Sequence, residues 1–349
     1  MGTPTTFILA AGGTGGHVMP ALALAEEMVQ NHHSAILMTD QRGVRYLQQP
    51  HAIGVKLIDT APPSAGRLRF WLGQLIGFWQ AVFYLLRCQP RAVVGFGGYP
   101  AMPTCLAAIT LRIPLILHEQ NAIIGRSNRF LKRFARQTIL SFGGKQINVP
   151  VRQSLIHGRA QLYHPPKTAT PFSLLVTGGS QGARVFEDLI PEALALLPLN
   201  LRQNLHVHHQ VSSTRLEELA KFYDQNSIRA DLKTFFANIQ DLLANCHLAI
   251  SRSGASSVAE AAMLGRPVIL VPFPYAADDH QRANALAMAD RGAAWVVDQA
   301  RLTPHQLAMM LANAMERPGT LAGVAAAARA LGNPKAAAEM LEQILRASA

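Results

Sequence analysis

Three glycine-rich loops, each preceded by a short apolar run and followed by a pattern typical of a helix, constrain the fold of this chain more than any other feature. With their apolar runs, they span residues 7–16, 92–98 and 172–182. Glycine lets the backbone approach a ligand closely at the carboxyl end of a parallel strand. One such loop could be an ordinary tight turn, but three in this arrangement are typical of parallel α/β sheets. Because two loops lie in the first half and one in the second, we expect two doubly wound α/β units.

The stretch of residues 251–285 repeats this arrangement with small residues in place of a glycine-rich loop. The apolar residues 248–250 predict a buried strand, and the turn after it should open a helix at Ala255 or Ser256. That helix should end at Gly265. The N–H groups at a helix start bind anions, so this stretch predicts a phosphate site.

Glu260 lies one turn beyond Ser256 and Ser257, where its carboxylate could accept hydrogen bonds from both hydroxyls of a ribose. Further polar residues that could contact sugar hydroxyls are Asp278, Asp279, His280, Gln281 and Asn284. Together these features indicate a sugar-nucleotide site. An ordinary strand-turn-helix unit with a hydrogen-bonded glutamate fits the same spacing equally well.

The composition fits two folded domains. Single cores rarely grow past about 250–300 residues, and this chain has 349, of which 49% are hydrophobic and 15% charged. Its three cysteines, Cys88, Cys105 and Cys246, have neither the spacing of a zinc knuckle nor that of a disulfide framework. The first residues lack the pattern of a signal peptide. We therefore expect a cytosolic protein.

The net charge of +11 favours an anionic partner, which could be a nucleic acid, an anionic membrane surface or a phosphorylated substrate. The basic residues are scattered, and the sequence has no zinc-finger, RNP-type or basic-zipper pattern. We therefore expect no nucleic-acid partner.

A nicotinamide dehydrogenase is a weaker alternative for the first loop. Its fingerprint, Gly-x-Gly-x-x-Gly, needs a third glycine where this chain has Val18 after Gly13 and Gly15. Asp40 does follow the next apolar run, where an acid that binds a ribose would lie, so the alternative stays open.

Residues 67–87 form a long apolar stretch with two of the three tryptophans and no charge between Arg69 and Arg87. The stretch is at the lower limit for a membrane span, about 17 residues, and its glutamines and glycines disfavour spanning. We expect a helix with one face toward the core and one apolar face, rimmed by Arg67, Arg69 and Arg87, that rests on a lipid surface. A fully buried core helix fits the same pattern.

Four polar residues, His118, Glu119, Gln120 and Asn121, follow the apolar run 113–117 and should cluster at the carboxyl end of a strand. The polar, proline-bounded residues 150–166 are typical of a connection between domains. Arg152, at the start of this connection, could reach a phosphate, although an exposed linker arginine is the ordinary interpretation.

His206 and His208 alternate along a predicted strand and so share one face, but the sequence brings no further metal ligand near them. The chain also has no Asp-x-Asp pattern to hold a divalent cation on nucleotide phosphates. We therefore predict no metal site and no cofactor.

Five motifs occur in the order and context seen in one family of enzymes. They span residues 13–17, 97–99, 118–121, 178–183 and 251–255 with Glu260. With these motifs, nearly the whole chain resembles the MurG family, the bacterial undecaprenyl-diphospho-muramoylpentapeptide N-acetylglucosaminyltransferases. Two short stretches, residues 100–103 and 148–152, depart from the family pattern.

The resemblance implies a GT-B fold, an α/β architecture in which two Rossmann-like, doubly wound domains face each other across a deep cleft. The acceptor and membrane-association domain would span residues 1–149, and the UDP-GlcNAc-binding domain would span residues 150–334. A C-terminal helix, at about residues 335–349, would pack back on the first domain.

The resemblance also implies an inverting transfer of GlcNAc from UDP-GlcNAc to the MurNAc C4 hydroxyl of lipid I, which forms lipid II in peptidoglycan synthesis. The enzyme would be peripheral, on the cytoplasmic face of the bacterial inner membrane, with an anionic membrane surface as a partner. Alternatives that stay open are another GT-B glycolipid synthase, a UDP-GlcNAc epimerase and a nucleotide-binding protein without catalysis.

The same resemblance assigns residues to the substrates. Gly97, Gly98 and Tyr99 would face the acceptor diphosphate, as would Thr14, Gly15 and Gly16, which are also counted among the donor-binding residues. The other expected donor-binding residues are Asn121, Arg152, Ser180, Gln181, Gly182, Phe236, Ser256, Ser257, Glu260, His280, Gln281 and Asn284. Among them, Glu260 would hold the ribose and the Phe236 backbone the uracil.

The chemistry requires a base that removes the acceptor proton. His17 is the first candidate, because an imidazole titrates near neutrality and its loop should face the substrates, and Glu119 is the second. Helix N-termini and Arg152 would stabilise the departing diphosphate in place of a metal ion.

Overall fold

The computed structural model describes residues 5–47, 53–167, 170–179 and 182–349, which form two compact units. Unit 1 consists of Met1–Gln153 and Asn333–Ala349, and unit 2 consists of Ser154–Gly332. The last residues of the chain thus belong to the first unit.

Unit 1 is built around a parallel sheet in the order β3-β2-β1-β4-β5-β6. Its strands are β1 (Thr6–Ala10), β2 (Ser34–Thr39), β3 (Gly54–Leu57), β4 (Ala92–Gly95), β5 (Leu115–Glu119) and β6 (Gln137–Leu140). Its helices are α1 (Gly15–Gln30), α2 (Gln41–Val44), α3 (Arg67–Cys88), α4 (Met102–Thr110), α5 (Arg126–Leu131) and α15 (Ala336–Ala347).

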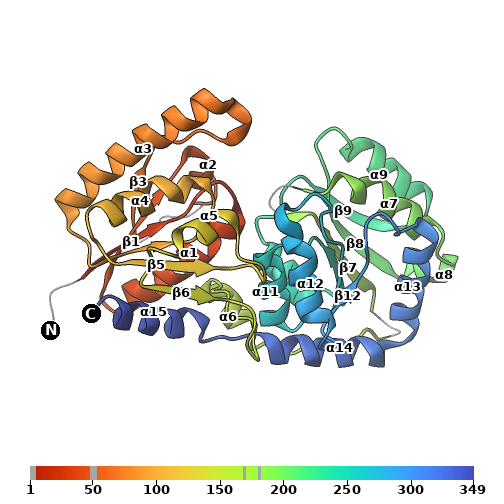
Figure 1. Cartoon of the computed structure of the whole chain (residues 1–349). Helices are drawn as coiled ribbons and strands as arrows, with labels where there is room; N and C mark the ends of the chain where they lie inside the picture. Colours follow the sequence, from red (N-terminus) through yellow and green to blue (C-terminus); the bar gives the residue numbers. More distant parts are fainter. Residues whose placement is uncertain (1–4, 48–52, 168–169, 180–181) are drawn as a thin grey trace. The chain divides into compact units, whose positions relative to one another are not determined.

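The central strand β1 supplies side chains to both faces of this sheet, because successive residues of a strand point in opposite directions. Phe7 and Leu9 enter a core that includes residues of α1 and α15, whereas Ile8 and Ala10 enter a core that includes residues of α3 and α4. Figure 1 shows α3 and α4 on one face of the sheet and α15 on the other. A strand covered on both faces must be apolar throughout, which explains why it reads as a continuous apolar run.

The C-terminal helix α15 is an integral part of unit 1. Its buried residues Met340, Leu341 and Ile344 lie in the same core as Phe7 and Leu9. In addition, the guanidinium of Arg136, just before β6, donates to the carbonyl oxygen of Ala347 at 3.2 Å. Helix α15 is therefore held on unit 1 both by the packing of its apolar side chains and by hydrogen bonds at its C-terminal end.

Unit 2 has a second parallel sheet, in the order β12-β11-β10-β7-β8-β9. Its strands are β7 (Phe172–Thr177), β8 (Leu205–Gln210), β9 (Arg229–Lys233), β10 (Leu248–Ser251), β11 (Val268–Leu270) and β12 (Trp295–Val296). Its helices are α7 (Arg184–Ala195), α8 (Leu199–Gln203), α9 (Leu216–Gln225), α10 (Ile239–Asn245), α11 (Ala255–Leu264), α12 (His280–Ala289), α13 (Pro304–Glu316) and α14 (Pro318–Leu331), and α6 (Gln153–Gly158) begins at the unit boundary.

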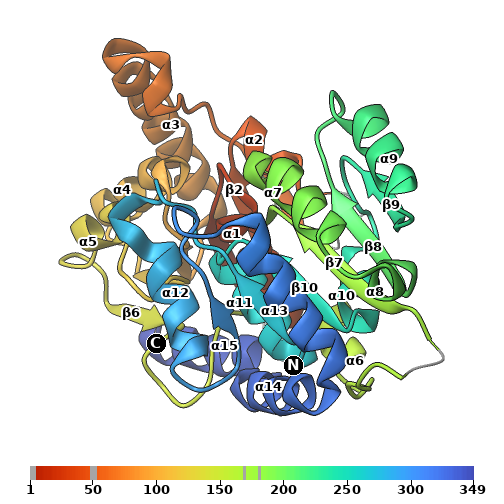
Figure 2. The same ribbon diagram turned by 90° about the vertical axis from the view of Figure 1, so that its right-hand side faces the viewer.

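One face of this sheet is covered by α7, α9 and α13. Phe172, Leu174 and Val176 of β7 pack in a core with Ile190 of α7 and Leu311 of α13. Figure 2 shows α7 and α13 beside each other over β7. Unit 2 is therefore a doubly wound α/β unit like unit 1.

Both sheets have the same strand order when the strands of each unit are numbered along the chain, namely 3-2-1-4-5-6. This is the order of Rossmann folds, in which ligands bind at the carboxyl ends of the strands where the order reverses. The reversal lies between β1 and β4 in unit 1 and between β7 and β10 in unit 2. We call the loops that follow these four strands the switch-point loops. All four coincide with motifs that the sequence singles out.

Helix α3 exposes most of its apolar side chains, so it is not a fully buried core helix. Its buried residues are Gly77, Ala81, Val82 and Leu85. The exposed ones are Leu68, Trp71, Leu72, Leu75, Ile76, Trp79, Phe83 and Leu86. Across the described residues, no helix has the length and hydropathy needed to cross a membrane.

Candidate substrate sites at the switch-point loops

The loop after β1 is held by the carboxylate of Asp40, which follows β2. Asp40 is buried, and its Oδ1 accepts hydrogen bonds from the N–H groups of Gly13, at 2.9 Å, and Gly43, at 3.0 Å. A Cβ on Gly12 would lie only 2.7 Å from the same oxygen, so only glycine fits there. Asp40 thus fixes the loop, which is a different task from binding the ribose of a nicotinamide cofactor.

The loop after β4 packs against the imidazole of His17, at the start of α1. Gly97 and Gly98 have φ values of 86° and 76°, which favour glycine. A Cβ on Gly98 would lie 3.3 Å from Nε2 of His17. The two switch-point loops of unit 1 therefore meet at this histidine.

Tyr99 connects the second loop to the first. Its hydroxyl accepts a hydrogen bond from Arg42 at 3.2 Å and donates to Oδ2 of Asp40 at 3.4 Å. Burial raises the pKa of Tyr99, so the phenol stays protonated and remains a donor at neutral pH.

The tautomer of His17 follows from its hydrogen bonds. Its Nδ1 lies 2.9 Å from the carbonyl oxygen of Phe96, and a carbonyl only accepts, so Nδ1 carries the proton. The side-chain amide of Gln120 is 2.6 Å from the same nitrogen. The structure places Nε2 of Gln120 at this position, and a protonated Nδ1 requires the amide to turn so that its oxygen faces the proton. Nε2 is then the basic nitrogen of His17.

Glu119, the last residue of β5, is engaged in holding the segment that follows it. It is buried, and its oxygens accept hydrogen bonds from the N–H groups of Asn121, at 3.0 Å, and Gly125, at 2.9 Å, and from Nδ2 of Asn128 at 2.9 Å. The Asn121 side chain also donates to Glu119, at 3.2 Å. These bonds suit a carboxylate that orders the loop around Gln120, and they leave His17 as the better placed base.

His118 differs from the expectation that it joins a polar cluster at the strand end. The strand β5 extends through Glu119, so His118 lies within it and is fully buried. Its Nε2 is 2.7 Å from Oγ of Ser141. Burial, with a smaller effect of nearby His17, lowers the pKa of His118 to about 3, so it is neutral at physiological pH and serves the packing of the sheet.

In unit 2, the loop after β7 is fixed by Gln210, at the end of β8. Its Oε1 accepts hydrogen bonds from the Thr177 hydroxyl at 2.8 Å and from the N–H of Gly178 at 3.1 Å. A Cβ on Gly178 would collide with the backbone of residues 182–183. Gly182 is exposed, with a φ of 72°, and the predicted site residues Ser180 and Gln181 lie outside the described residues.

The loop after β10 opens α11 at Ala255, as the sequence predicts, without a side chain that caps it. The first turn of α11 contains no acidic residue. Within the described part of the chain, the buried hydroxyl oxygens of Ser253 and Ser256 have no hydrogen-bond partner. Buried hydroxyls are normally satisfied, so this helix start has the donors and the local dipole to bind an anion.

Arg252 is a buried guanidinium in this loop that the sequence reasoning misses as a functional group. It is 7% exposed, and it donates to the carbonyl oxygens of Val271 and Pro272 and to Oε1 of Gln299. Its position inside the motif 251–255 is the only signal that could have identified it. Arg252 ties the ends of β10 and β11 together beneath the start of α11.

The remaining predicted donor residues of unit 2 differ in their surroundings. Glu260, Ser257, His280 and Gln281 are partly exposed, and Phe236 is buried. Oε1 of Gln281 accepts a hydrogen bond from the N–H of Phe273 at 3.0 Å. Nδ1 of His280 lies 2.7 Å from the carbonyl oxygen of Ala277.

Asn284, which we predict to contact a sugar hydroxyl, lies on α12. It is fully buried, and its Nδ2 donates to the carbonyl oxygen of Ser253 at 3.1 Å. Its role in the structure is to support the turn before α11. Arg152 lies in unit 1, just before α6 and close to the unit boundary.

Two family models match the chain, one over each unit. The glycosyltransferase family 28 N-terminal domain matches residues 7–140, and the glycosyltransferase family 28 C-terminal domain matches residues 173–341.

Curated relatives and solved structures agree with these matches. The UDP-N-acetylglucosamine--N-acetylmuramyl-(pentapeptide) pyrophosphoryl-undecaprenol N-acetylglucosamine transferase of Rhodospirillum rubrum is 43% identical over 98% of this chain and 92% of its own length. The crystal structure of Acinetobacter baumannii MurG has a TM-score of 0.76 at 30% identity, covering 98% of this chain and all of that one.

A UDP-N-acetylglucosamine 2-epimerase is also similar in structure, with a TM-score of 0.69 over 99% of this chain and 96% of that one, but at 12% identity. A similarity of this kind shows a shared fold without a shared reaction. The near-complete match at 43% identity is much more specific. The chain therefore belongs to glycosyltransferase family 28 and, within it, to the MurG family.

Proposed function

We infer that this chain is an inverting glycosyltransferase that moves GlcNAc from UDP-GlcNAc to the MurNAc C4 hydroxyl of lipid I, which yields lipid II. The relatives that cover nearly the whole chain bear this activity in their names. The structural observation that carries it is the uncapped start of α11, where the buried hydroxyls of Ser253 and Ser256 have no partner among the described residues. That is what a diphosphate site needs.

We propose that His17 is the general base. Its Nε2 would take the proton of the acceptor C4 hydroxyl as that oxygen attacks the anomeric carbon of GlcNAc. The bond from the anomeric carbon to the diphosphate oxygen breaks, and UDP leaves with the bonding electrons. One displacement inverts the configuration, and no covalent enzyme intermediate is required. The Phe96 carbonyl and the Gln120 amide support this role because they keep the proton on Nδ1.

The leaving diphosphate would be stabilised by backbone and side-chain donors. Charge develops on the diphosphate as the glycosidic bond breaks, and donors that are already oriented cost no reorganisation at that moment. In our proposal these donors are the start of α11 with Ser256 and Ser257, together with Arg152 and the loop containing Ser180, Gln181 and Gly182.

The rest of the donor would be recognised by three groups of residues. Glu260 would accept hydrogen bonds from the ribose hydroxyls, since it lies one turn into the same helix as the phosphate donors. The backbone at Phe236 would contact the uracil. His280, Gln281 and Asn121 would contact the GlcNAc, with Asn284 as a positioning residue beneath the turn.

We assign the acceptor to unit 1 and the UDP of the donor mainly to unit 2, with Asn121 and Arg152 as donor-binding residues that belong to unit 1. The acceptor diphosphate would lie against the loops with Thr14, Gly15, Gly16 and with Gly97, Gly98, Tyr99. Backbone N–H groups in such glycine-rich loops are suited to anions. This division follows the unit boundary at Gln153 and the return of α15 to unit 1.

We propose that the exposed apolar face of α3 rests on an anionic membrane surface. Trp71 and Trp79 are 68% and 52% exposed, and exposed apolar faces of this extent mark interaction sites. The net charge of +11 adds attraction to anionic lipids. Since lipid I carries a lipid chain, this location is the cytoplasmic face of the bacterial inner membrane, and a nucleic-acid partner is not needed to explain the charge.

The test is a transfer assay with labelled UDP-GlcNAc, a short-chain lipid I analogue and excess EDTA. We expect label in the lipid product under chelation, because protein groups stabilise the diphosphate. Transfer that requires added magnesium would remove the metal-free account of the leaving group and keep the reaction.

The same assay separates the alternatives. Conversion of UDP-GlcNAc to an epimer without acceptor would favour an epimerase, and transfer only to other lipids would favour another glycolipid synthase. Binding of UDP without any product would leave a nucleotide-binding protein. Each of these outcomes would overturn the assignment to lipid I.

A further inference from the structure

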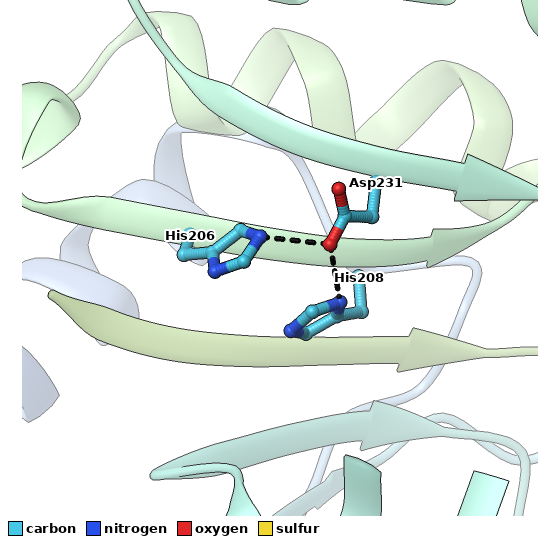
Figure 3. Close-up of side chains that lie close together, drawn as sticks. All are labelled: His206, His208 and Asp231. Atoms are coloured by element: carbon cyan, nitrogen blue, oxygen red, sulfur yellow. Dashed lines mark hydrogen bonds and ion pairs between the residues drawn. The ribbon is translucent and has the colours of Figure 1, made fainter. Parts of the chain in front are cut away.

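A cluster of two histidines and an aspartate lies on one face of the sheet of unit 2, at its β9 edge (Figure 3). His206 and His208 alternate along β8, and Asp231 of β9 pairs directly with His208 in the strand register. Alternate residues of a strand share a face, and paired residues of neighbouring strands lie side by side. The backbone ladder therefore holds all three side chains in place.

The three side chains converge on one point. Nε2 of His206 is 2.9 Å and Nδ1 of His208 is 3.1 Å from the same oxygen, Oδ2 of Asp231. One ligand atom from each residue lies within 4.8 Å of the others. In a tetrahedral zinc site with bonds of about 2.0–2.2 Å, ligand atoms are about 3.3–3.6 Å apart. Small side-chain movements would thus admit an ion between them.

The donor set is typical of late first-row transition metals. Two imidazole nitrogens with one carboxylate oxygen suit Zn²⁺, Co²⁺ or Ni²⁺, whereas Mg²⁺ and Ca²⁺ favour sites made of oxygen alone. An imidazole binds metal only when neutral.

Charges on the same face oppose a cation and limit the expected affinity. Arg229 and Lys233 alternate with Asp231 along β9 and are both exposed. Solvent and salt screen exposed charges, and the Asp231 carboxylate lies between them. The position opposite the three ligands remains for water, as in sites with three protein ligands.

We propose that His206, His208 and Asp231 form a binding site for a divalent transition metal ion, with Zn²⁺ as the ion of choice. The bound ion links β8 to the edge strand β9. The His208 ring also contacts the Phe236 ring, with 6.4 Å between their centres. The ion therefore stabilises the strand that leads into the loop of Phe236. This site goes beyond the proposed transfer reaction and takes no part in stabilising the diphosphate.

The experiment is a Co²⁺ titration of the untagged full chain after removal of metals, followed by visible absorption, with Zn²⁺ as the competitor. We expect one Co²⁺ per chain, a ligand-field spectrum that Zn²⁺ abolishes, and a higher Tm with Zn²⁺. The double variant His206→Gln with His208→Gln should bind at least tenfold more weakly, because loss of even an outer-shell partner weakens metal sites about 10–100-fold.

The matched control is His164→Gln with His305→Gln, which removes two exposed imidazoles from the same unit. It should keep the spectrum and the affinity. Equal binding by both double variants, or no binding by the unaltered chain, would show that the cluster is only a hydrogen-bonded group and overturn the proposal. If the cluster variant does not fold, Asp231→Asn decides. It keeps the side-chain shape at a half-exposed position, and unchanged affinity in that variant would also overturn the proposal.

Discussion

The switch-point loops of the two units occupy the same topological position and yet present opposite chemistry. In unit 1 they bring together an imidazole, a phenol and buried carboxylates, with His17 at the contact between the loops. In unit 2 they bring together glycine backbone, serine hydroxyls and the start of α11. In our proposal the first set supplies the base in addition to its contacts with the acceptor diphosphate, and the second set holds the donor diphosphate.

The groups that fix these loops follow the same division. Asp40, a carboxylate, holds the first loop of unit 1, whereas Gln210, a neutral amide, holds the first loop of unit 2. A carboxylate accepts stronger hydrogen bonds from backbone N–H groups than an amide oxygen does, whereas the amide orders the backbone without adding a negative charge. The comparison teaches that the strand order sets where a ligand can bind, and the residues after each glycine turn set which ligand.

We expect the largest effect from replacing His17, the proposed base in the loops of unit 1. His17→Ala should lower kcat about 10²–10⁴-fold, the range for loss of a general base. UDP affinity should stay within error, because we assign the UDP of the donor mainly to unit 2. Steady-state transfer assays and calorimetric titration with UDP measure the two quantities. Turnover near that of the unaltered enzyme would refute His17 as the base. A parallel loss of UDP binding would contradict the assignment of the base to the loops of unit 1 and of UDP binding to those of unit 2.

The two units also differ in their proposed contact with the membrane, because α3, which makes this contact, belongs to unit 1. Trp71→Glu with Trp79→Glu removes two exposed rings and adds two negative charges. Burying an aromatic side chain contributes roughly 1.5–3 kcal/mol, so binding to anionic vesicles should fall about 100-fold or more. The matched control is Leu196→Glu with Leu199→Glu, at positions of unit 2 with comparable exposure. Equal losses in a vesicle sedimentation assay would show only a general charge effect.

The sequence predicts the strands at the switch points well because they are buried on both faces. The expected apolar runs at residues 7–11, 92–94, 172–177 and 248–250 agree with β1, β4, β7 and β10 to within one residue at each end. Helices cover the faces of parallel sheets, so each of these strands reads as an uninterrupted apolar run followed by a turn. The expectation of two doubly wound units is thereby confirmed.

The edge strand β9 illustrates what the sequence does not reveal. Its residues Arg229–Lys233 alternate between exposed and partly buried positions, so it lacks the apolar run of a central strand. The proximity of Asp231 to His206 and His208 depends on strand register, which becomes visible only when β8 and β9 are paired. For this reason the sequence shows two ligands of the cluster and not the third.

Polar residues near strand ends are the other group that sequence patterns misjudge. His118 belongs to a run of polar residues that the sequence places at a strand end, yet it is fully buried, and its imidazole lies 2.7 Å from the Ser141 hydroxyl. The sequence leaves Gln120 and Arg252 without a role, yet Gln120 contacts the proposed base and Arg252 braces the turn before α11. All of these side chains are polar, so residue type alone does not distinguish them. Their hydrogen-bond partners in the folded protein decide which polar group is available to a ligand.

Glu260 tests the anion-binding side of the comparison with a smaller effect. Glu260→Gln should weaken UDP binding about tenfold or somewhat more, since a hydrogen bond to a charged group contributes about 1.5–3 kcal/mol. The acceptor KM should not change. Glu192→Gln on α7, an exposed position of the same unit, is the matched control for loss of one negative charge. A UDP affinity that is equal in both variants would place the ribose elsewhere.

The smallest expected effect concerns the residues that hold the loops, Asp40 and Gln210. Asp40→Ala leaves the N–H groups of Gly13 and Gly43 without a charged acceptor, a loss of about 1.5–3 kcal/mol, whereas Gln210→Ala removes a neutral acceptor worth about 0.5–1.5 kcal/mol. Hydrogen exchange read by mass spectrometry should therefore rise more in residues 11–17 of the first variant than in residues 172–179 of the second. Each change should stay within its own unit, because each acceptor binds only backbone and side chains of that unit. If Gln210→Ala loosens its loop as much as Asp40→Ala does, the carboxylate has no structural advantage over the amide.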